Sequence, residues 1–87
     1  MSNEGTHSFT PKDGFVPDRE TAIVIAEAVT RRIYGHTNIE RQKPFQVSLQ
    51  GEVWTIAGTL PSQKVGGTFE IQLSKIDGRV IRVTHGK

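Results

Sequence analysis

The spacing of hydrophobic residues changes once along this chain, after about residue 36, and this change restricts the possible folds more than any other feature. Before it, apolar residues recur every three or four positions, which is typical of one face of a helix. After it, they alternate with polar residues, which is typical of strands with one buried face. Since 87 residues suffice for only one small domain, the order predicts an α+β fold in which one helix covers one sheet.

The helical segment is PDRETAIVIAEAVTRRIYG, residues 17–35. Asp18 is a suitable N-cap because its carboxylate can accept the free amide hydrogens of the first turn, and Gly35 can supply the left-handed residue that commonly closes a helix. Glu27 and Arg31 stand four residues apart on the far side, in the order that favours a surface ion pair. One apolar stripe is predicted to face the sheet, and its members are Ala22, Ile25, Ala26, Val29 and Ile33.

Four segments with alternating apolar residues follow, at residues 44–50, 53–60, 68–74 and 79–84. The connections through Gln50-Gly51-Glu52 and Asp77-Gly78 are short, so neighbouring strands should be antiparallel and form a four-stranded meander. A weaker strand is expected from Asn38 to Gln42. Residues 1–16 are polar and are predicted to be a flexible N-terminal arm, which leaves residues 17–87 as the single domain.

Trp54, the only tryptophan, falls on the strand 53–60 on the same side as Ile56 and Leu60. A tryptophan with such neighbours usually anchors a core, and its indole N–H then finds one hydrogen-bond partner. Two alternatives stay open at this point, because the side chain could also form the wall of a pocket or contact a partner.

Composition excludes several classes of function. The chain lacks cysteine, so neither disulfides nor thiolate metal sites can stabilise it. It has no run of eighteen apolar residues and no signal-peptide pattern, and a cytoplasmic protein without a membrane partner is expected. Its net charge of +2 is small and its basic residues are scattered, which argues against nucleic-acid binding.

The titratable residues do not form a catalytic or metal-binding pattern. His7, His36 and His85 lie far apart and lack the spacing of a helical metal pair, so each is predicted to be a solvated surface residue. Gly66-Gly67 follows Lys64, but the P-loop pattern is missing. We therefore predict no enzyme activity, no cofactor, no bound metal and no small-molecule substrate. The acidic side chains likewise show no converging pair of the kind that acid–base catalysis needs; they are Glu20, Glu27, Glu52, Glu70 and Asp77.

A series of short motifs runs through the chain in a fixed order. It begins with Pro17, Glu20-Thr21-Ala22, Ala26-Glu27-Ala28 and Tyr34-Gly35, and continues with KPFQVSL, VWTIAGTLP, GGTFEIQLSKIDGRV and the terminal THGK. This ordered series resembles the immunity proteins with a nuclear-transport-factor-2 fold. The resemblance implies a helix packed on a strongly curved antiparallel sheet, as in cystatin-like and nuclear-transport-factor-2-like proteins, in a short version. It also implies that the protein binds the catalytic domain of a cognate bacterial toxin of a polymorphic toxin system and protects the producing cell.

Two other functions remain as alternatives, namely a small enzyme or ligand-binding domain of the same fold and a cystatin-like peptidase inhibitor. Inhibitors of nucleases tend to be acidic, so this slightly basic chain fits a toxin with an acidic cleft better than a nuclease.

The expected toxin-binding surface is the outer face of the sheet with its adjoining loops, because the helix stripe and the inner face are committed to the core. The residues assigned to it are Lys64, Val65, Gly66, Gly67, Arg82, His85 and Lys87. Arg31 and Arg32 are the next candidate, although a helix end favours cations through its dipole in any case. The residues expected to act as structural anchors are Trp54, Tyr34, Gly35, Phe45 and Phe69.

Overall fold

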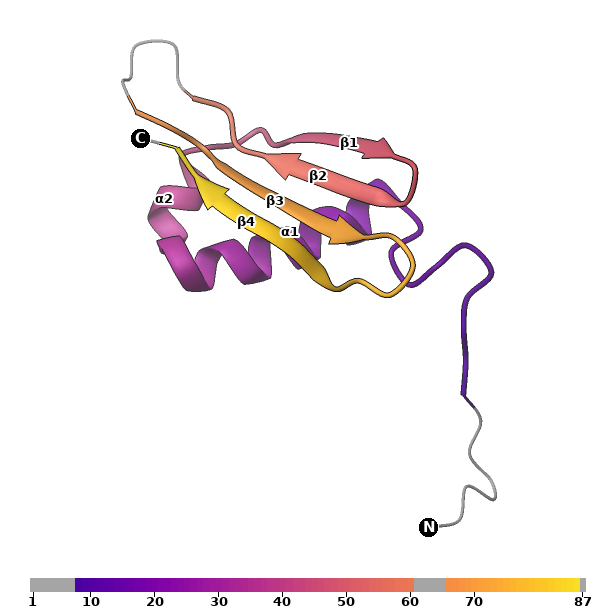
Figure 1. Cartoon of the computed structure of the whole chain (residues 1–87). Helices are drawn as coiled ribbons and strands as arrows, with labels where there is room; N and C mark the ends of the chain where they lie inside the picture. Colours follow the sequence, from indigo (N-terminus) through magenta and orange to yellow (C-terminus); the bar gives the residue numbers. More distant parts are fainter. Residues whose placement is uncertain (1–7, 61–65, 87) are drawn as a thin grey trace.

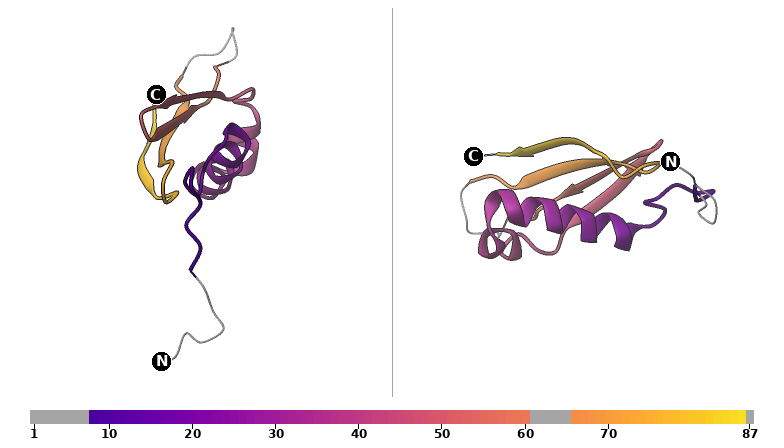
Figure 2. Two further views of the ribbon diagram at one scale, coloured as in Figure 1. Left: turned by 90° about the vertical axis from the view of Figure 1, so that its right-hand side faces the viewer. Right: turned by 90° about the horizontal axis from the view of Figure 1, so that it is seen from below.

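The computed structural model describes residues 8–60 and 66–86, and it shows two helices on one face of a four-stranded antiparallel sheet (Figure 1). The strands lie in the order β1-β2-β3-β4, so each pairs with its neighbour in sequence. Seen along its length, the sheet curves around the helix α1 (Figure 2). The predicted α+β meander is confirmed. The elements are α1 (Arg19–Tyr34), α2 (His36–Glu40), β1 (Gln46–Gln50), β2 (Val53–Ala57), β3 (Phe69–Ser74) and β4 (Val80–His85).

Helix α1 begins and ends at the predicted residues. Asp18 Oδ1 accepts a hydrogen bond from the Thr21 amide at 2.8 Å, which satisfies one free donor of the first turn. Gly35 follows the last turn with φ of 91°, a conformation that costs glycine little. Neither described helix is long and apolar enough to cross a lipid bilayer.

The stripe of α1 that faces the sheet differs from the predicted one in its last turns. Ala22 and Ala26 are fully buried as expected, but Ile33 is 54% exposed and the buried position belongs to Thr30. Thr30 tolerates burial because its hydroxyl donates to the Ala26 carbonyl oxygen at 2.7 Å, so no polar group is left without a partner. The prediction for Ile33 was wrong because a count of apolar residues cannot recognise a self-satisfied threonine.

The core lies between α1 and the two central strands. Trp54 is 7% exposed, and its indole Nε1 donates to the Val16 carbonyl oxygen at 2.7 Å. Val16 is itself buried, and its amide donates to Lys75 O at 3.0 Å. The last residue of the segment predicted as an arm therefore packs against the sheet, whereas residues 1–7 lie outside the described part and the boundary at residue 17 stays a prediction. The strand residues that complete the core are Ile56, Phe69, Ile71 and Leu73.

Two predicted strands are wrong in extent or kind. The segment from Asn38 to Gln42 contributes to helix α2 and the turn after it, where Ile39 is buried. The tryptophan strand ends at Ala57, because the Thr59 amide donates to the Gln42 carbonyl oxygen at 2.7 Å and the chain leaves the sheet there. The chain after α2 thus passes beside the end of β2, where Gln42 accepts the hydrogen bond from the Thr59 amide.

Candidate binding surface

The described helices leave the outer face of the sheet uncovered (Figure 2). Both helices lie on the opposite face (Figure 2). Strand pairing places Thr55 beside Gln72 and Gln72 beside Arg82, and the Gln72 amide donates to the Thr55 hydroxyl at 3.4 Å. Arg82 is exposed and forms no ion pair with any described residue. The surface is therefore polar, backed by a hydrogen-bonded sheet, and carries an available cation.

Two segments of the predicted toxin-binding surface, residues 64–67 and the C-terminal residues 85–87, meet in part at one end of the sheet. The Gly86 amide donates to Thr68 O at 3.0 Å, and Gly67 lies so close to the backbone of Gly86 that a β-carbon would overlap it. Gly66 is exposed beside them. The other members of these segments, Lys64, Val65 and Lys87, lie outside the described residues.

His85 belongs to an internal hydrogen-bond network, and the prediction of a solvated surface residue was wrong. Its Nδ1 donates to Gly86 O at 2.7 Å, so its Nε2 accepts from the Gln42 side-chain amide at 3.2 Å. Its ring also stacks at a tilt on Tyr34, with centroids 4.8 Å apart. His85 pairs with Phe69 across the sheet and shares its inner face, so its side chain points toward the helices rather than to the outer surface.

Gln42 is the residue that sequence reasoning missed at this site. Its side chain is 4% exposed, and its Oε1 accepts from the Phe69 amide at 2.9 Å while its Nε2 also reaches Asn38 Oδ1 at 3.2 Å. Nothing in the sequence distinguishes this glutamine from the surface glutamines, since its partners lie up to 43 residues away. It joins α2, β3 and β4 at one buried point.

Arg31 lies in a ring of four alternating charges that links both helices to the start of β1. Its Nη2 is 2.6 Å from Glu40 and 3.3 Å from Glu27, and Lys43 Nζ closes the ring at 3.0 and 3.1 Å from the same two carboxylates. The pKa of Glu40 is lowered by its bonds from Lys43 and Arg31, and the pKa of Lys43 is raised by Glu40 and Glu27. The predicted Glu27–Arg31 pair is confirmed. Because its guanidinium is already engaged, Arg31 is less available to a partner than Arg32, which is exposed.

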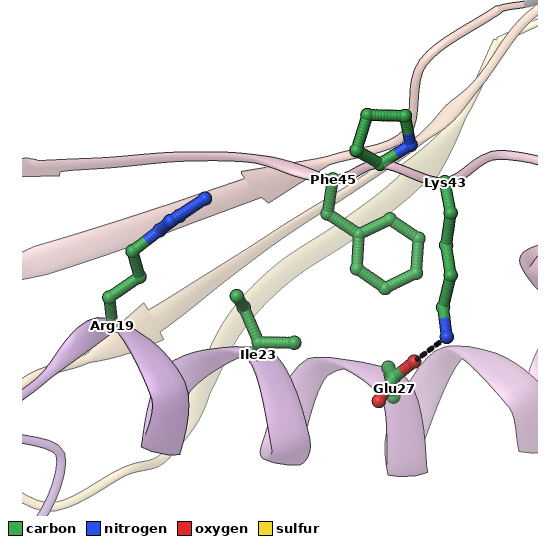
Figure 3. A pocket seen from close by; sticks show the side chains of 6 residues that line it. Arg19, Ile23, Glu27, Lys43 and Phe45 are labelled. Atoms are coloured by element: carbon green, nitrogen blue, oxygen red, sulfur yellow. Dashed lines mark ion pairs between the residues drawn. The ribbon is translucent and has the colours of Figure 1, made fainter.

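A shallow cavity of about 280 Å³ lies between α1 and the start of β1 (Figure 3). Arg19, Glu27 and Lys43 give it charged walls, and the Glu27 carboxylate is already paired with Lys43. Trp54 does not line it, so the pocket-wall alternative finds no support in this cavity. Among the described residues, no three histidine or acidic side chains converge to hold a metal ion. The remaining lining residues are apolar: Ile23, Pro44 and Phe45.

Comparison with known proteins identifies relatives for most of the chain. A family model described as NTF2 fold immunity protein matches residues 21–87. The chain is 33% identical over 73 residues to the uncharacterized protein YhhH of Escherichia coli K12, and 34% identical over 67 residues to the uncharacterized protein YbbC of the same strain. These alignments cover 83% and 76% of this chain but 58% and 55% of the two relatives, so the chain spans little more than half of their length. No solved structure matches it.

Proposed function

This chain belongs to the family of NTF2 fold immunity proteins, and from this premise we propose that it binds a cognate bacterial toxin and neutralises it by covering the surface at which the toxin acts. The family match over residues 21–87 is the observation that carries the proposal. It favours a binding protein over an enzyme, and we propose that the chain has no catalytic activity of its own. The proposed place of action is the cytoplasm of the producing cell.

The geometry supports the outer sheet face as the proposed toxin-binding surface. A standard interface takes about 800 Å² and roughly 20–30 residues from each partner, so a large share of a small domain must take part. The inner face is buried against α1, and Arg31 is held by two carboxylates. The outer face is rigid because each strand is hydrogen-bonded to its neighbours, so little conformational entropy is lost when a partner binds.

Three cationic residues, Lys64, Arg82 and Lys87, suggest the charge of the toxin surface that this protein binds. Arg82 stands on the outer face without an ionic partner among the described residues. Lys64 and Lys87 lie close in sequence to Gly66, Gly67 and Gly86, of which Gly67 and Gly86 meet at one end of the sheet. We propose that these three cationic residues meet acidic groups on the toxin. Charges at the rim of an interface mainly accelerate encounter, so their effect should be greatest at low salt.

Charge reversal at Lys64, Arg82 and Lys87 together tests this assignment. We expect the triple glutamate variant to bind the toxin's catalytic domain more weakly and to associate at least about tenfold more slowly at low salt, with an unchanged circular-dichroism spectrum. We propose that the toxin is encoded beside this gene, and co-purification of this chain with the C-terminal domain of that neighbouring protein measures binding.

Arg41→Glu is the matched control, because Arg41 is exposed next to α2 on the opposite side of the molecule. An unchanged association rate in the triple variant, with full protection of cells, would move the interface away from the outer face. Arg32→Glu, at the exposed end of α1, would then be the next variant to measure.

A further inference from the structure

Strand β1 is an open edge of the sheet, and its backbone is prepared for a further strand. The Gly58 amide donates to Phe69 O at 3.0 Å and the Lys75 amide to Glu52 O at 2.8 Å, so even-numbered residues of this part of β2 direct their backbone groups toward β3. The odd-numbered Val53, Thr55 and Ala57 therefore direct theirs toward β1. Their partners in β1 are Gln50, Ser48 and Gln46. It follows that the N–H and C=O groups of Val47 and Leu49 point away from the sheet.

The features that normally protect an edge strand are missing from β1. Natural edges avoid pairing through charged side chains, prolines within the strand or bulges. The strand sequence Gln46-Val47-Ser48-Leu49-Gln50 contains no charge and no proline, and its pairing with β2 is regular over all five residues. Four of the five residues are exposed, including Leu49 at 41%.

The same strand is complementary to itself. Placed antiparallel about Ser48, two copies bring Gln46 opposite Gln50, Val47 opposite Leu49 and Ser48 opposite Ser48. Every pair then joins residues of the same face, as a continuous sheet requires, and Val47 and Leu49 exchange the outward-pointing backbone hydrogen bonds. We infer that β1 pairs with β1 of a second copy of this chain, and that the two sheets join into one of eight strands, four from each copy.

The shape of the surface beside β1 agrees with this register. Leu49 of the second copy lies diagonally across from Phe45, where a diagonal neighbour is still within reach of a large side chain. This places its side chain at the mouth of the cavity that Ile23 and Phe45 line (Figure 3).

The proposed interface between the two copies is small. The strand and the cavity rim supply about ten residues from each copy, against the roughly 20–30 of a standard interface. We therefore expect a weak dimer with a dissociation constant in the micromolar range or above, which forms without the toxin and leaves both outer sheet faces uncovered. The inference is thus separate from the proposed function, and either can fail alone.

Sedimentation equilibrium of the intact chain tests the inference, over concentrations from about 5 to about 500 µM, which bracket a micromolar dissociation constant. We expect the mean mass to rise from monomer toward dimer. Ser48→Lys places two like charges opposite each other on the symmetry axis and should keep the chain monomeric, as should Ser48→Glu. An equimolar mixture of the two variants should dimerise again, because the pair across the axis is then of opposite charge.

Thr84→Lys on β4 is the matched control and should dimerise like the unchanged chain, since it puts the same charge on the opposite edge of the sheet. Circular dichroism checks that each variant folds. The inference is overturned if the unchanged chain stays monomeric at every concentration. It is equally overturned if a folded Ser48→Lys variant still dimerises, or if the mixture fails to restore the dimer.

Discussion

The two edges of the sheet are built differently, although both belong to one meander of short strands. Strand β1 is regular and uncharged, and an ion-pair ring holds the chain just before it through Lys43. Strand β4 carries Arg82, and its pairing with β3 is interrupted by a bulge between Gln72 and Leu73. Exposed apolar side chains are more numerous on β4, where Val80 and Ile81 are each 43% exposed.

The comparison indicates that exposed apolar area alone does not identify the edge that we infer to pair with a second copy. A bulge turns the strand and leaves a residue outside the ladder, so the backbone of β4 offers a less regular template than that of β1. The C-terminal end of β4 is also held in place, since His85 bonds to Gln42 and packs on Tyr34. Strand β1 combines a regular ladder with no repelling charge, and this combination directs the pairing inference to β1.

The largest expected effect is the loss of stability in Trp54→Ala, and this variant tests whether both edges of the sheet are stabilised by the same core. Trp54→Ala should lower the free energy of unfolding by about 3–5 kcal/mol, because it leaves a large cavity beside β3. Urea denaturation followed by circular dichroism measures the loss. Trp54→Phe is the control, and it should cost less because most of the buried volume remains while the bond to Val16 O is lost.

Hydrogen exchange on Trp54→Ala sharpens the comparison. Amide protons of β1 and β4 should lose protection together if both edges unfold with the shared core. Loss confined to β1 would show that the edges are separate cooperative units. A loss of stability well under 1 kcal/mol would contradict the buried position of the indole.

A smaller effect is expected at Gln42, the buried residue that ties down β4. Gln42→Met keeps most of the volume but leaves the Phe69 amide without an acceptor, which should cost about 1–3 kcal/mol of stability. Exchange should rise most at the His85 end of β4, because that side chain loses its partner. Asn38→Ala removes only the acceptor at 3.2 Å and is the matched control. If Gln42→Met raises the exchange rates of β1 and β4 amides equally, the hydrogen-bond network of Gln42 does not stabilise β4 in particular.

The smallest effect is a difference in how the edges respond to pH. The pKa of Glu40 near β1 is lowered from 4.5 and that of Asp77 in the turn before β4 is lowered from 3.8, so each stabilises the fold above its ordinary pKa and loses this as acid protonates it. The pKa of Lys43 is raised from 10.5, so its contribution is complete below that value and is lost as the pH rises through the raised pKa.

Acid should therefore loosen both edges, whereas alkali should loosen only the region before β1. Carbon-detected NMR of the carbonyl groups of residues 43–50 and 80–85 follows both edges across the titration. Lys43→Met should lose the alkaline response and keep the acid response of Asp77. An alkaline response at β4 in that variant would show that Lys43 is not its source.

The local features of the fold were predictable from neighbouring residues. The caps of α1 need only Asp18 and Gly35, and the alternation of apolar residues marks three strand faces whatever the rest of the chain does. The antiparallel order follows from short turns, and the series of motifs from Tyr34-Gly35 onward was enough to indicate the family. These signals act over a few residues, so they are present in the sequence itself.

Only the tertiary structure decided which polar residues are buried and which edge is open. Gln42 meets His85 across 43 residues, and the indole of Trp54 meets Val16 across 38. Arg31 loses its availability because Glu40, on the next helix, lies 2.6 Å away. Such contacts depend on how the helices and strands pack, because a buried polar side chain needs hydrogen-bond partners and those of Gln42 and Trp54 come from distant parts of the chain. Spacing along the chain carries no record of those distances.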